Sequence, residues 1–441
     1  MQRRDFIKHG SMAAGFMILP SSSIFSSNEG RVRMAYIGVG SRGRTHVEAG
    51  LLRNDVEVIA ICDTQEGSLA ATRQLFTKHK KKMPVEYTGG TEAFKKMLDR
   101  NDIDAVIIST PWEFHKEQSI YAMRAGIYVG CEVVAGITLE DHWEIAKVYE
   151  KTKVPYMTLE NVNYRRDLLA VLNMVRQGIF GELLHLEGGY QHDLREIFFN
   201  KGEFGPQTEI GESQWRTRYN VDRDGDIYPT HGIGPIMNCI NINKGNRFTS
   251  LVSISSKARG LSAYLDKVSP GNKNARLNYK NGDVTTTLLN CANGETVVLR
   301  HDTHLPRPYS LDFRVQGTKG LWMDANQSIY IEGAEKNHHE WEKAEPWLTK
   351  YDHPLWKKYA ADAAGAGHGG MDWFVFNAFV QAVKYKKQTP IDIYDSLTMS
   401  VITPLSEQSL KEGNKPQEFP DFTRGAWKNA KPAFALDDSG M

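Results

Sequence analysis

The chain has 441 residues, of which 41% are hydrophobic and 24% are charged, and its formal net charge is +1. This length favours two domains, and the composition is typical of a globular protein. The near-neutral charge argues against a nucleic-acid or anionic-membrane partner, and no apolar run is long enough to span a bilayer.

The N-terminus has the pattern of an export signal. Arg3-Arg4-Asp5-Phe6-Ile7-Lys8 is a twin-arginine motif, and a short apolar run, 12–19, follows it. We therefore expect residues 1–30 to be a signal region that engages the twin-arginine export machinery and sends the protein to the periplasm. The alternative is the basic N-terminus of a cytoplasmic protein.

A short apolar strand is expected at 33–37, and a glycine pattern follows it at once. Gly38, Gly40 and Gly43 have the spacing G-x-G-x-x-G. In this pattern the first glycine permits a tight turn and the second lets the backbone approach a pyrophosphate. The third lets the next helix pack closely, with its N-terminus facing the phosphates. The spacing predicts a dinucleotide site.

A second apolar strand, 56–62, ends in Asp63, which lies 20 residues after Gly43. An acidic side chain at this distance can accept hydrogen bonds from the adenosine ribose, and it repels a 2′-phosphate. Asp63 therefore favours NAD over NADP as the cofactor. A turn or a helix cap is the alternative interpretation of this residue.

Three further apolar runs are expected to be strands: 105–109, 127–131 and 155–159. Thr110 and Pro111 suit the N-cap and the first position of a helix, and Thr138 with Asp141 repeats this capping pattern. Strands that alternate with helices form a parallel, doubly wound sheet that binds ligands at the carboxyl ends of its strands. We expect a Rossmann NAD-binding domain over residues 31–162.

From about residue 183 the pattern changes to short strands joined by Gly, Asn and Asp turns. The expected strands are 285–290, 296–301, 311–315 and 329–332. A final helix is expected at 373–384, after a glycine-rich loop. We expect an α+β substrate domain over residues 163–441, with a mainly antiparallel, open-faced sheet and C-terminal helices that can pack back on the first domain. The exposed face of such a sheet can pair with another subunit, so a homo-oligomer is possible.

The cysteines are far apart in the sequence and lack the spacing of metal ligands. We expect four buried thiols and no metal site: Cys62, Cys131, Cys239 and Cys291.

Loops of the second domain gather phenol, guanidinium and imidazole groups. Tyr228-Pro229-Thr230-His231 places three kinds of polar group in one loop, and Tyr190, Arg216 and Tyr309 lie in loops of similar composition. Such groups suit a polar, ring-shaped ligand such as a sugar, whose hydroxyls need paired donors and acceptors. A lone histidine is more often structural, so only this clustering makes His231 a candidate.

At these residues the chain resembles the Gfo/Idh/MocA oxidoreductase family and, more closely, glycoside hydrolase family 109. The shared motifs cover nearly all of the chain after the signal region, and they include TPWEFH, EVVAGITLE, LENVNYRRD, GGYQHDLR, YPTHGIGP, HDT, RPYSL and GAGHGGMD. Dehydrogenases of the larger family carry Glu-Lys-Pro after the fourth strand. Here the segment is Glu132-Val133 with no lysine, which argues against simple dehydrogenase chemistry.

The resemblance implies an NAD-dependent glycosidase that acts on terminal α-linked N-acetylhexosamine glycosides, as an α-N-acetylgalactosaminidase does. Besides the glycine turn, the implied cofactor contacts are Ser41, Arg42, Asp63, Trp112, Glu113, Phe114, His115, Glu132, Val133 and Asn161. The implied sugar contacts are Tyr190, Arg216, Tyr228, Pro229, Thr230, His231 and Tyr309.

The implied chemistry takes hydride from C3 of the sugar to NAD, removes the C2 proton, eliminates the aglycone, adds water and returns the hydride. We expect His231 to be the acid/base at the C3 hydroxyl. We expect Tyr164 to remove the C2 proton, if Arg165, Arg166 or the nicotinamide lowers its pKa. A cofactor that cycles without dissociating suits a protein exported in the folded state. The alternatives are an exported sugar oxidoreductase and a non-catalytic sugar-binding protein.

Overall fold

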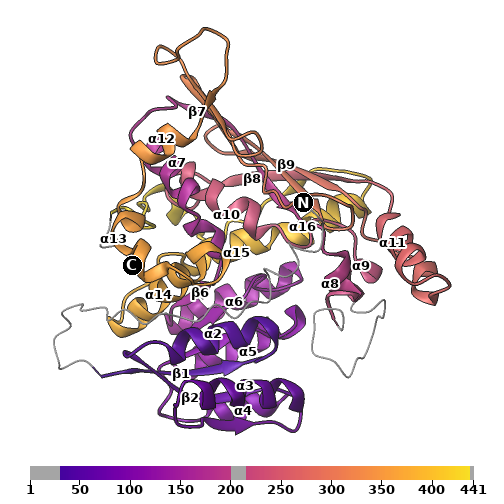
Figure 1. The fold of residues 1–441 in the computed structure, drawn as a ribbon, viewed down its shortest axis with the longest axis vertical. Helices are drawn as coiled ribbons and strands as arrows, with labels where there is room; N and C mark the ends of the chain where they lie inside the picture. The colour runs from indigo at the N-terminus through magenta and orange to yellow at the C-terminus, as the bar shows by residue number, and fades with distance from the viewer. Residues whose placement is uncertain (1–29, 200–214, 438–441) are drawn as a thin grey trace.

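The computed structural model describes residues 30–199 and 215–437, and it contains two sheets with helices between them (Figure 1). Apart from Gly30, the predicted signal region lies outside the described residues. Among the residues that are described, no helix combines the length and the apolar character that a membrane span requires.

The first sheet confirms the predicted parallel, doubly wound arrangement. In the described chain it has six strands in the order β3-β2-β1-β4-β5-β6, all parallel. The strands are β1 (Val32–Ile37), β2 (Val56–Cys62), β3 (Val85–Tyr87), β4 (Ala105–Ile108), β5 (Tyr128–Cys131) and β6 (Tyr156–Thr158). The strand order reverses between β1 and β4, and such a switch point is where these sheets bind ligands.

Helices connect the strands of the first sheet: α2 (Ser41–Leu51), α3 (Glu66–Lys78), α4 (Ala93–Leu98), α5 (Trp112–Arg124) and α6 (Leu139–Thr152). The predicted capping of α6 is confirmed, because Thr138 and Asp141 form a reciprocal capping box. The predicted capping of α5 by Thr110 is wrong. The N-cap of α5 is Pro111, and the Thr110 hydroxyl instead donates to Gln118 Oε1 at 2.7 Å.

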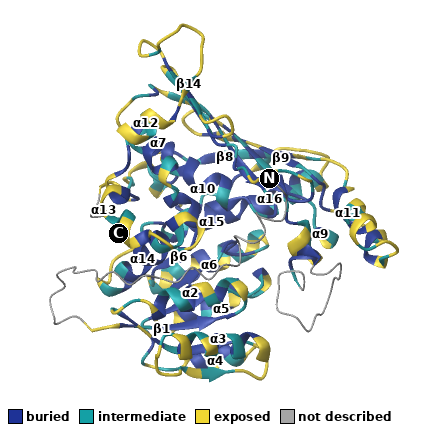
Figure 2. Ribbon diagram, viewed as in Figure 1, coloured by how far each residue is buried: buried dark blue, intermediate teal, exposed yellow. Residues whose placement is uncertain are grey.

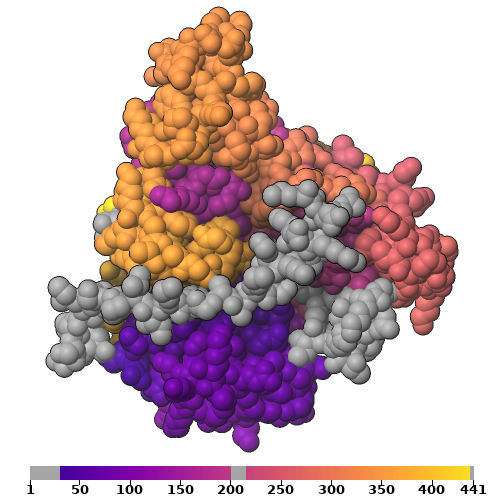
Figure 3. All heavy atoms as spheres, in the orientation of Figure 1, coloured from indigo at the N-terminus to yellow at the C-terminus, as the bar shows by residue number. Residues whose placement is uncertain are grey.

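The second sheet is mainly antiparallel, as predicted. Among the described residues its order is β14-β13-β12-β11-β7-β10-β9-β8-β15, and the β7–β10 pair is parallel. The strands are β7 (Leu183–Gln191), β8 (Phe248–Ser255), β9 (Thr285–Cys291), β10 (Thr296–Asp302), β11 (Arg314–Gly317), β12 (Gly320–Met323), β13 (Ser328–Ile331), β14 (Glu342–Lys343) and β15 (Gln417–Glu418). The region of β12 to β14 projects from the top of the molecule in Figure 3.

The remaining helices are η1 (Asn161–Tyr164), α7 (Arg166–Arg176), α8 (Arg195–Phe198), α9 (Arg216–Asp222), α10 (Thr230–Cys239), α11 (Gly260–Val268), η4 (Lys273–Arg276), α12 (Glu345–Lys350), α13 (Pro354–Ala363), η5 (His368–Gly370), α14 (Met371–Lys384), α15 (Ile393–Ser400), α16 (Ile402–Lys411) and η6 (Ala426–Lys428). The helix expected at 373–384 is α14, but it is not the final one, since α15 and α16 follow. The start of α15 is signalled by a capping box between Asp392 and Asp395.

C-terminal helices join the two sheets into one body. α14 contacts β1 and α2, α15 contacts β6 and α6, and α16 contacts β8. One continuous cluster of buried hydrophobic residues includes side chains of both sheets, and Figure 2 shows these buried residues running from the first sheet to the second. All four cysteines are free and buried, as predicted. The packing fixes the second sheet above the carboxyl ends of the first.

Candidate active site

The glycine turn between β1 and α2 has the geometry that the sequence predicts. Gly38 has a φ of +78°, and a Cβ on it would lie 2.7 Å from the carbonyl carbon and oxygen of Ser109. A Cβ on Gly43 would lie 1.9 Å from the carbonyl oxygen of Gly38. Gly40 is the N-cap of α2, and no side chain of the described residues caps this helix. Its first N–H groups can therefore bind an anionic group such as a pyrophosphate.

Asp63, at the end of β2, shapes this turn. Its Oδ2 accepts from the backbone N–H of Val39 at 2.8 Å, and its Oδ1 accepts from that of Gln65 at 2.8 Å. Burial raises the pKa of Asp63, although these hydrogen bonds oppose the shift. Asp63 is thus part of a turn, and each carboxylate oxygen keeps a second lone pair that a ribose hydroxyl could use.

Arg42 ties the first turn of α2 to two carboxylates from distant segments. Its guanidinium donates to Glu132 Oε1 at 2.7 Å and to Asp372 Oδ2 at 2.9 Å. His46 Nε2 also lies 2.6 Å from Glu132 Oε1. Burial opposes ionisation of both carboxyl groups. The charge of Arg42 nevertheless holds the pKa of Glu132 well below its ordinary value. The pKa of Asp372 is likewise held well below its ordinary value by its hydrogen bond with His368 and by Arg42. The predicted cofactor residues Arg42 and Glu132 therefore meet in one charged network.

Asn161 joins the same network and has an unused acceptor. Its Nδ2 donates to Asp372 Oδ1 at 2.7 Å, whereas its buried Oδ1 has no hydrogen-bond partner among the described residues. The buried hydroxyl of Ser109, at the carboxyl end of β4, is likewise without a partner in the described chain. Buried polar atoms are normally paired, and the amide and hydroxyl groups of a nicotinamide nucleotide can pair with them. These residues fit NAD.

The segment between β4 and α5 is fixed against the segment after β5. The imidazole of His115 is fully buried, with Nδ1 at 2.6 Å from the carbonyl oxygen of Val134 and Nε2 at 2.8 Å from that of Thr110. Val133, the residue before Val134, is also buried.

Three more predicted cofactor residues lie on the first turn of α5. Trp112 is buried, Phe114 is partly buried, and Glu113 is exposed. The ring of Trp112 stacks on Tyr219 of α9 with 4.8 Å between centroids, and the Tyr219 hydroxyl donates to Glu113. Exposed Ser41 lies at the start of α2. The first turn of α5 thus connects the predicted cofactor site with α9.

His231, near the N-terminus of α10, is held by a buried glutamate. Its Nδ1 lies 2.8 Å from both Oε1 and Oε2 of Glu160, whose side chain has no exposed area. The Glu160 Oε1 also accepts from the backbone N–H of Val162 at 3.0 Å. Because a carboxylate can only accept, Nδ1 carries the proton, and Nε2 is the ring nitrogen left to exchange a proton with a ligand.

Aromatic rings surround this imidazole. Tyr190 and Tyr228 meet the His231 ring edge to face, with centroids 5.1 and 4.9 Å away. Tyr309 is half exposed and lies near Tyr190, with 6.5 Å between centroids. The guanidinium carbon of Arg216 lies 4.8 Å from the Tyr228 ring centroid. The structure therefore brings five of the seven predicted sugar contacts together, although they come from four separate segments.

Pro229 and Thr230 complete the predicted sugar loop. Pro229 is the N-cap of α10, and Thr230 is its first residue. The Thr230 side chain is fully buried, and its Oγ1 has no hydrogen-bond partner among the described residues.

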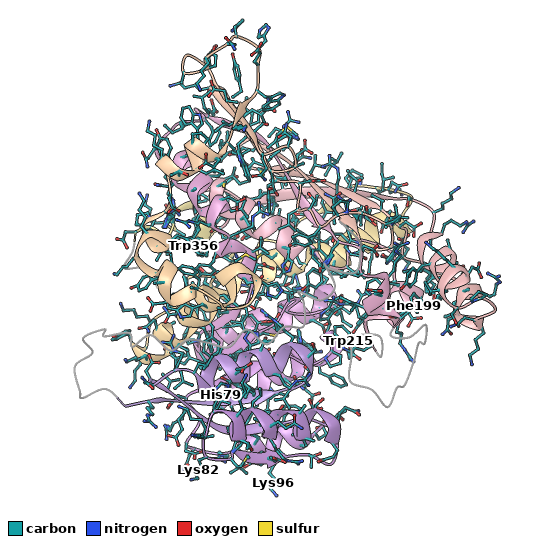
Figure 4. The ribbon with its side chains drawn as sticks, in the orientation of Figure 1. His79, Lys82, Lys96, Phe199, Trp215 and Trp356 are labelled. Atoms are coloured by element: carbon teal, nitrogen blue, oxygen red, sulfur yellow. The ribbon has the colours of Figure 1, made fainter. Side chains whose placement is uncertain are left out.

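The prediction that Tyr164 removes the C2 proton is wrong. Tyr164 is 1% exposed, and its ring packs against Phe374 and Phe434. Burial raises its pKa well above the ordinary value, whereas a base at this position needs a lowered one. Trp356, which donates to the Tyr164 carbonyl oxygen at 2.8 Å, lies well apart from Trp215, the neighbour of Arg216, in Figure 4.

The two arginines that were expected to lower the pKa of Tyr164 are engaged elsewhere. Arg165 pairs with Asp167 and Asp324, and Arg166 pairs with Asp352. Each guanidinium thus has its own carboxylate partners.

Replacing Tyr164 with phenylalanine should leave turnover within about twofold of the parent. The hydroxyl has no hydrogen-bond partner in the described chain, so its removal should change the free energy of unfolding by less than about 1 kcal/mol, or stabilise the protein. Steady-state kinetics and urea denaturation check this. A loss of turnover above tenfold with unchanged stability would restore the catalytic role.

Asp226, two residues before Tyr228, should make stability depend on pH. It is buried, it accepts from the Tyr228 N–H at 3.2 Å, and burial raises its pKa to about 7. Because the folded pKa is above the unfolded one, the folded state binds more protons between about pH 4 and pH 7, and stability falls as the pH rises through that window. The Asp226→Asn variant stays neutral and keeps an acceptor.

We expect the stability advantage of Asp226→Asn over the parent to grow by roughly 2 kcal/mol between pH 5 and pH 8. Urea denaturation at both pH values measures it. A constant difference between the two proteins would show that Asp226 does not titrate in this range.

Sequence reasoning gave no role to several residues that the structure places at the site. Glu160 orients His231, and His192 Nδ1 lies 3.2 Å from the Tyr190 hydroxyl. Asp372 links Arg42 to His368, whose Nδ1 is 2.8 Å away. His368 is exposed. Burial lowers the pKa of His192, and the charge of Arg216 adds to this effect. The glycine-rich loop that contains His368 is the sequence signal that marks this segment.

Comparisons with known proteins identify relatives of both parts of the chain. Residues 164–429 match the family described as glycosyl hydrolase 109, C-terminal domain, and residues 32–159 match the oxidoreductase family with an NAD-binding Rossmann fold. A glycosyl hydrolase family 109 protein of Stenotrophomonas maltophilia is 51% identical, over 99% of each chain. An α-N-acetylgalactosaminidase of Tannerella forsythia is 46% identical, over 93% of this chain and 90% of that one.

Solved structures share the fold at lower identity. A levoglucosan dehydrogenase in complex with NADH and levoglucosan has a TM-score of 0.63 at 18% identity, covering 89% of this chain and all of that one. Myo-inositol 2-dehydrogenase of Lactobacillus plantarum has a TM-score of 0.60 at 18% identity, covering 88% of this chain and all of that one. By its sequence matches, the chain belongs to glycosyl hydrolase family 109 and is a glycosidase with an NAD-binding domain of the Gfo/Idh/MocA type.

Proposed function

We propose that this glycosidase cleaves terminal α-linked N-acetylgalactosaminides by oxidation at C3, elimination of the aglycone, addition of water and re-reduction. The observation that carries the proposal is the His231–Glu160 pair, which faces a cluster of aromatic and cationic side chains beside the NAD-binding edge. The substrate follows from relatives named α-N-acetylgalactosaminidase in Tannerella forsythia and Shewanella oneidensis, which are 46% and 42% identical.

When bound, NAD supplies an acceptor for the C3 hydride and returns that hydride after cleavage, so no net oxidation results. The residues that would hold it are the glycine turn with the N-terminus of α2, Asp63, the start of α5 and the Asn161 side chain. Glu132 acts through Arg42, which it holds at the start of α2.

His231 is the proposed acid/base at the C3 hydroxyl. Glu160 keeps the Nδ1 proton in place, so Nε2 accepts the hydroxyl proton and later gives it back. Tyr190 and Tyr228 restrict the His231 ring on two sides. The Arg216 guanidinium, packed on Tyr228, offers donors to sugar oxygens.

The test is hydrolysis of a panel of nitrophenyl glycosides in deuterated water by the purified full chain. The proposal requires nitrophenol release without net NADH and solvent deuterium at C2 of the released sugar. Cleavage with hydrogen retained at C2 would contradict the elimination route, because only that route exchanges this hydrogen.

A sugar oxidoreductase is the second candidate, favoured by the fold shared with NADH-bound levoglucosan dehydrogenase. It predicts one NADH for each sugar oxidised and no release of the aglycone. The same assay, read at the NADH absorbance, separates the two activities.

We also propose that the protein is exported folded, with its cofactor enclosed, by the twin-arginine pathway to the periplasm. The support is the Arg3-Arg4 motif and a chemistry that regenerates its cofactor. Replacing both arginines with lysine should move the activity from the periplasmic to the cytoplasmic fraction, and an unchanged distribution would contradict the proposal.

A further inference from the structure

His301 occupies a distinct place beside the proposed sugar site. It is the next-to-last residue of β10 and pairs in register with Tyr190 on the parallel strand β7. Side chains at paired positions of neighbouring strands point to the same face of a sheet. Tyr190 packs against His231, so His301 lies on the face that carries the site. The HDT motif to which it belongs has no role in the function proposed above.

The imidazole of His301 is buried without the hydrogen bonds that buried histidines normally make. It is 1% exposed, and its buried Nδ1 has no hydrogen-bond partner among the residues that the structure describes. Each of the other fully buried histidines has at least one hydrogen bond, namely His46, His115, His142, His304 and His353. A buried polar group without a partner costs free energy, so this imidazole is expected to pair with a bound molecule.

The ring of His301 is neutral. Burial disfavours its charged form, and the nearby His304 and Arg216 add to this effect, which lowers its pKa to about 3. A neutral imidazole offers one N–H donor and one acceptor nitrogen. Such a group suits a hydroxyl or an amide and gives no charge attraction to a carboxylate or phosphate.

Thr230, on helix α10, also has a buried polar atom without a hydrogen-bond partner among the described residues. This atom is Oγ1, and the side chain is fully buried at the start of α10, next to His231 in the chain. Two unused polar groups, one on β10 and one on α10, thus flank the Tyr190–His231 contact.

We propose that His301 is a specificity-determining residue, whose imidazole hydrogen-bonds a neutral polar substituent on a sugar carbon next to C3. This proposal rests on the proposed function, in which His231 contacts the C3 hydroxyl. The substituent is either the C2 acetamido group or the C4 hydroxyl, which share the chemistry of a neutral donor and acceptor.

The test compares His301→Phe and His301→Gln with the parent on nitrophenyl α-N-acetylgalactosaminide, α-galactoside and α-N-acetylglucosaminide. We expect His301→Phe to lower kcat/KM for the first substrate at least tenfold, mainly through KM. His301→Gln keeps a donor and an acceptor and should recover part of the loss. Bound NAD and Tm should stay within the range of the parent.

The pattern across substrates identifies the group that is bound. A smaller loss on the galactoside assigns the contact to the C2 acetamido group, and a smaller loss on the glucosaminide assigns it to the C4 hydroxyl. Equal losses on all three substrates, or no loss on any, would overturn the proposal. Arg300→Gln is the matched control, since Arg300 precedes His301 on β10 but pairs with Glu187 on the opposite face, and its kcat/KM should not change.

Calorimetric binding of free N-acetylgalactosamine to the parent and to His301→Phe separates this proposal from the proposed function. If the parent cleaves no glycoside, the proposed function fails, yet weaker sugar binding by the variant still supports a sugar contact by His301. Equal binding of the sugar by the parent and by His301→Phe overturns the proposed contact with His301.

Discussion

Replacing His231 with asparagine is expected to lower kcat by about a thousandfold or more while the protein stays folded and keeps its NAD. The variant loses the nitrogen that exchanges a proton with the C3 hydroxyl, whereas an amide of similar size can still donate to Glu160. The NAD-binding residues lie on other segments, so cofactor content should not change. Glycoside hydrolysis and NAD released on denaturation measure the two properties.

The buried partner of His231 should matter as well. Glu160→Gln removes the charge that fixes the Nδ1 proton, so we expect a loss of about a hundredfold or more in kcat with little change in KM. His185→Asn is the matched control, because His185 lies on β7 and contacts Thr296 and Glu187 away from the site. If His231→Asn kept more than a tenth of the parent kcat, or lost NAD too, the role assigned to His231 would be incorrect.

Replacing Gly43 with alanine should abolish NAD binding and destabilise the first domain by roughly 3 kcal/mol or more. The added Cβ would lie 1.9 Å from the carbonyl oxygen of Gly38, and neither atom belongs to a flexible side chain. Relief of this clash must therefore move β1 or α2, which form the turn itself. The midpoint of urea unfolding and the NAD content of the purified protein report the two effects.

Gly30→Ala provides the control for that experiment. A Cβ at Gly30 meets no atom within 4 Å, and its φ lies outside the left-handed region. We expect its stability and NAD content to match those of the parent. A Gly43→Ala protein with normal NAD content would mean that the turn can open without losing its ligand geometry.

Much of the first domain could be predicted from sequence because its signals are local. The glycine spacing, the apolar runs and the Thr138–Asp141 box each act within a few residues, and the structure has the predicted turn, strands and cap. β3 was missed because it has only three residues, Val-Glu-Tyr, none of them fully buried. The N-cap of α5 was predicted wrongly because the Thr110 hydroxyl donates a hydrogen bond to the side chain of Gln118, eight residues later.

The arrangement of the catalytic side chains was harder to predict from the sequence. Tyr164 lies within the LENVNYRRD motif and beside two arginines, but its ring packs against Phe374 and Phe434 in the core. Nothing within a few residues of Tyr164 indicates that packing. Glu160, only four residues earlier, points to His231 instead.

By itself, the sequence determined the family, the two types of sheet and the segments that carry the site. Periodicity, glycine spacing and long motifs are patterns of neighbouring residues, so they can be recognised without the structure. Only the tertiary structure decided which side chains meet. His231 and Glu160 are 71 positions apart, and Arg42 and Asp372 are 330 positions apart. Their pairing depends on how α10 packs against β7 and η1, and on how α14 packs against β1 and α2. This packing is set by the whole core rather than by any local pattern.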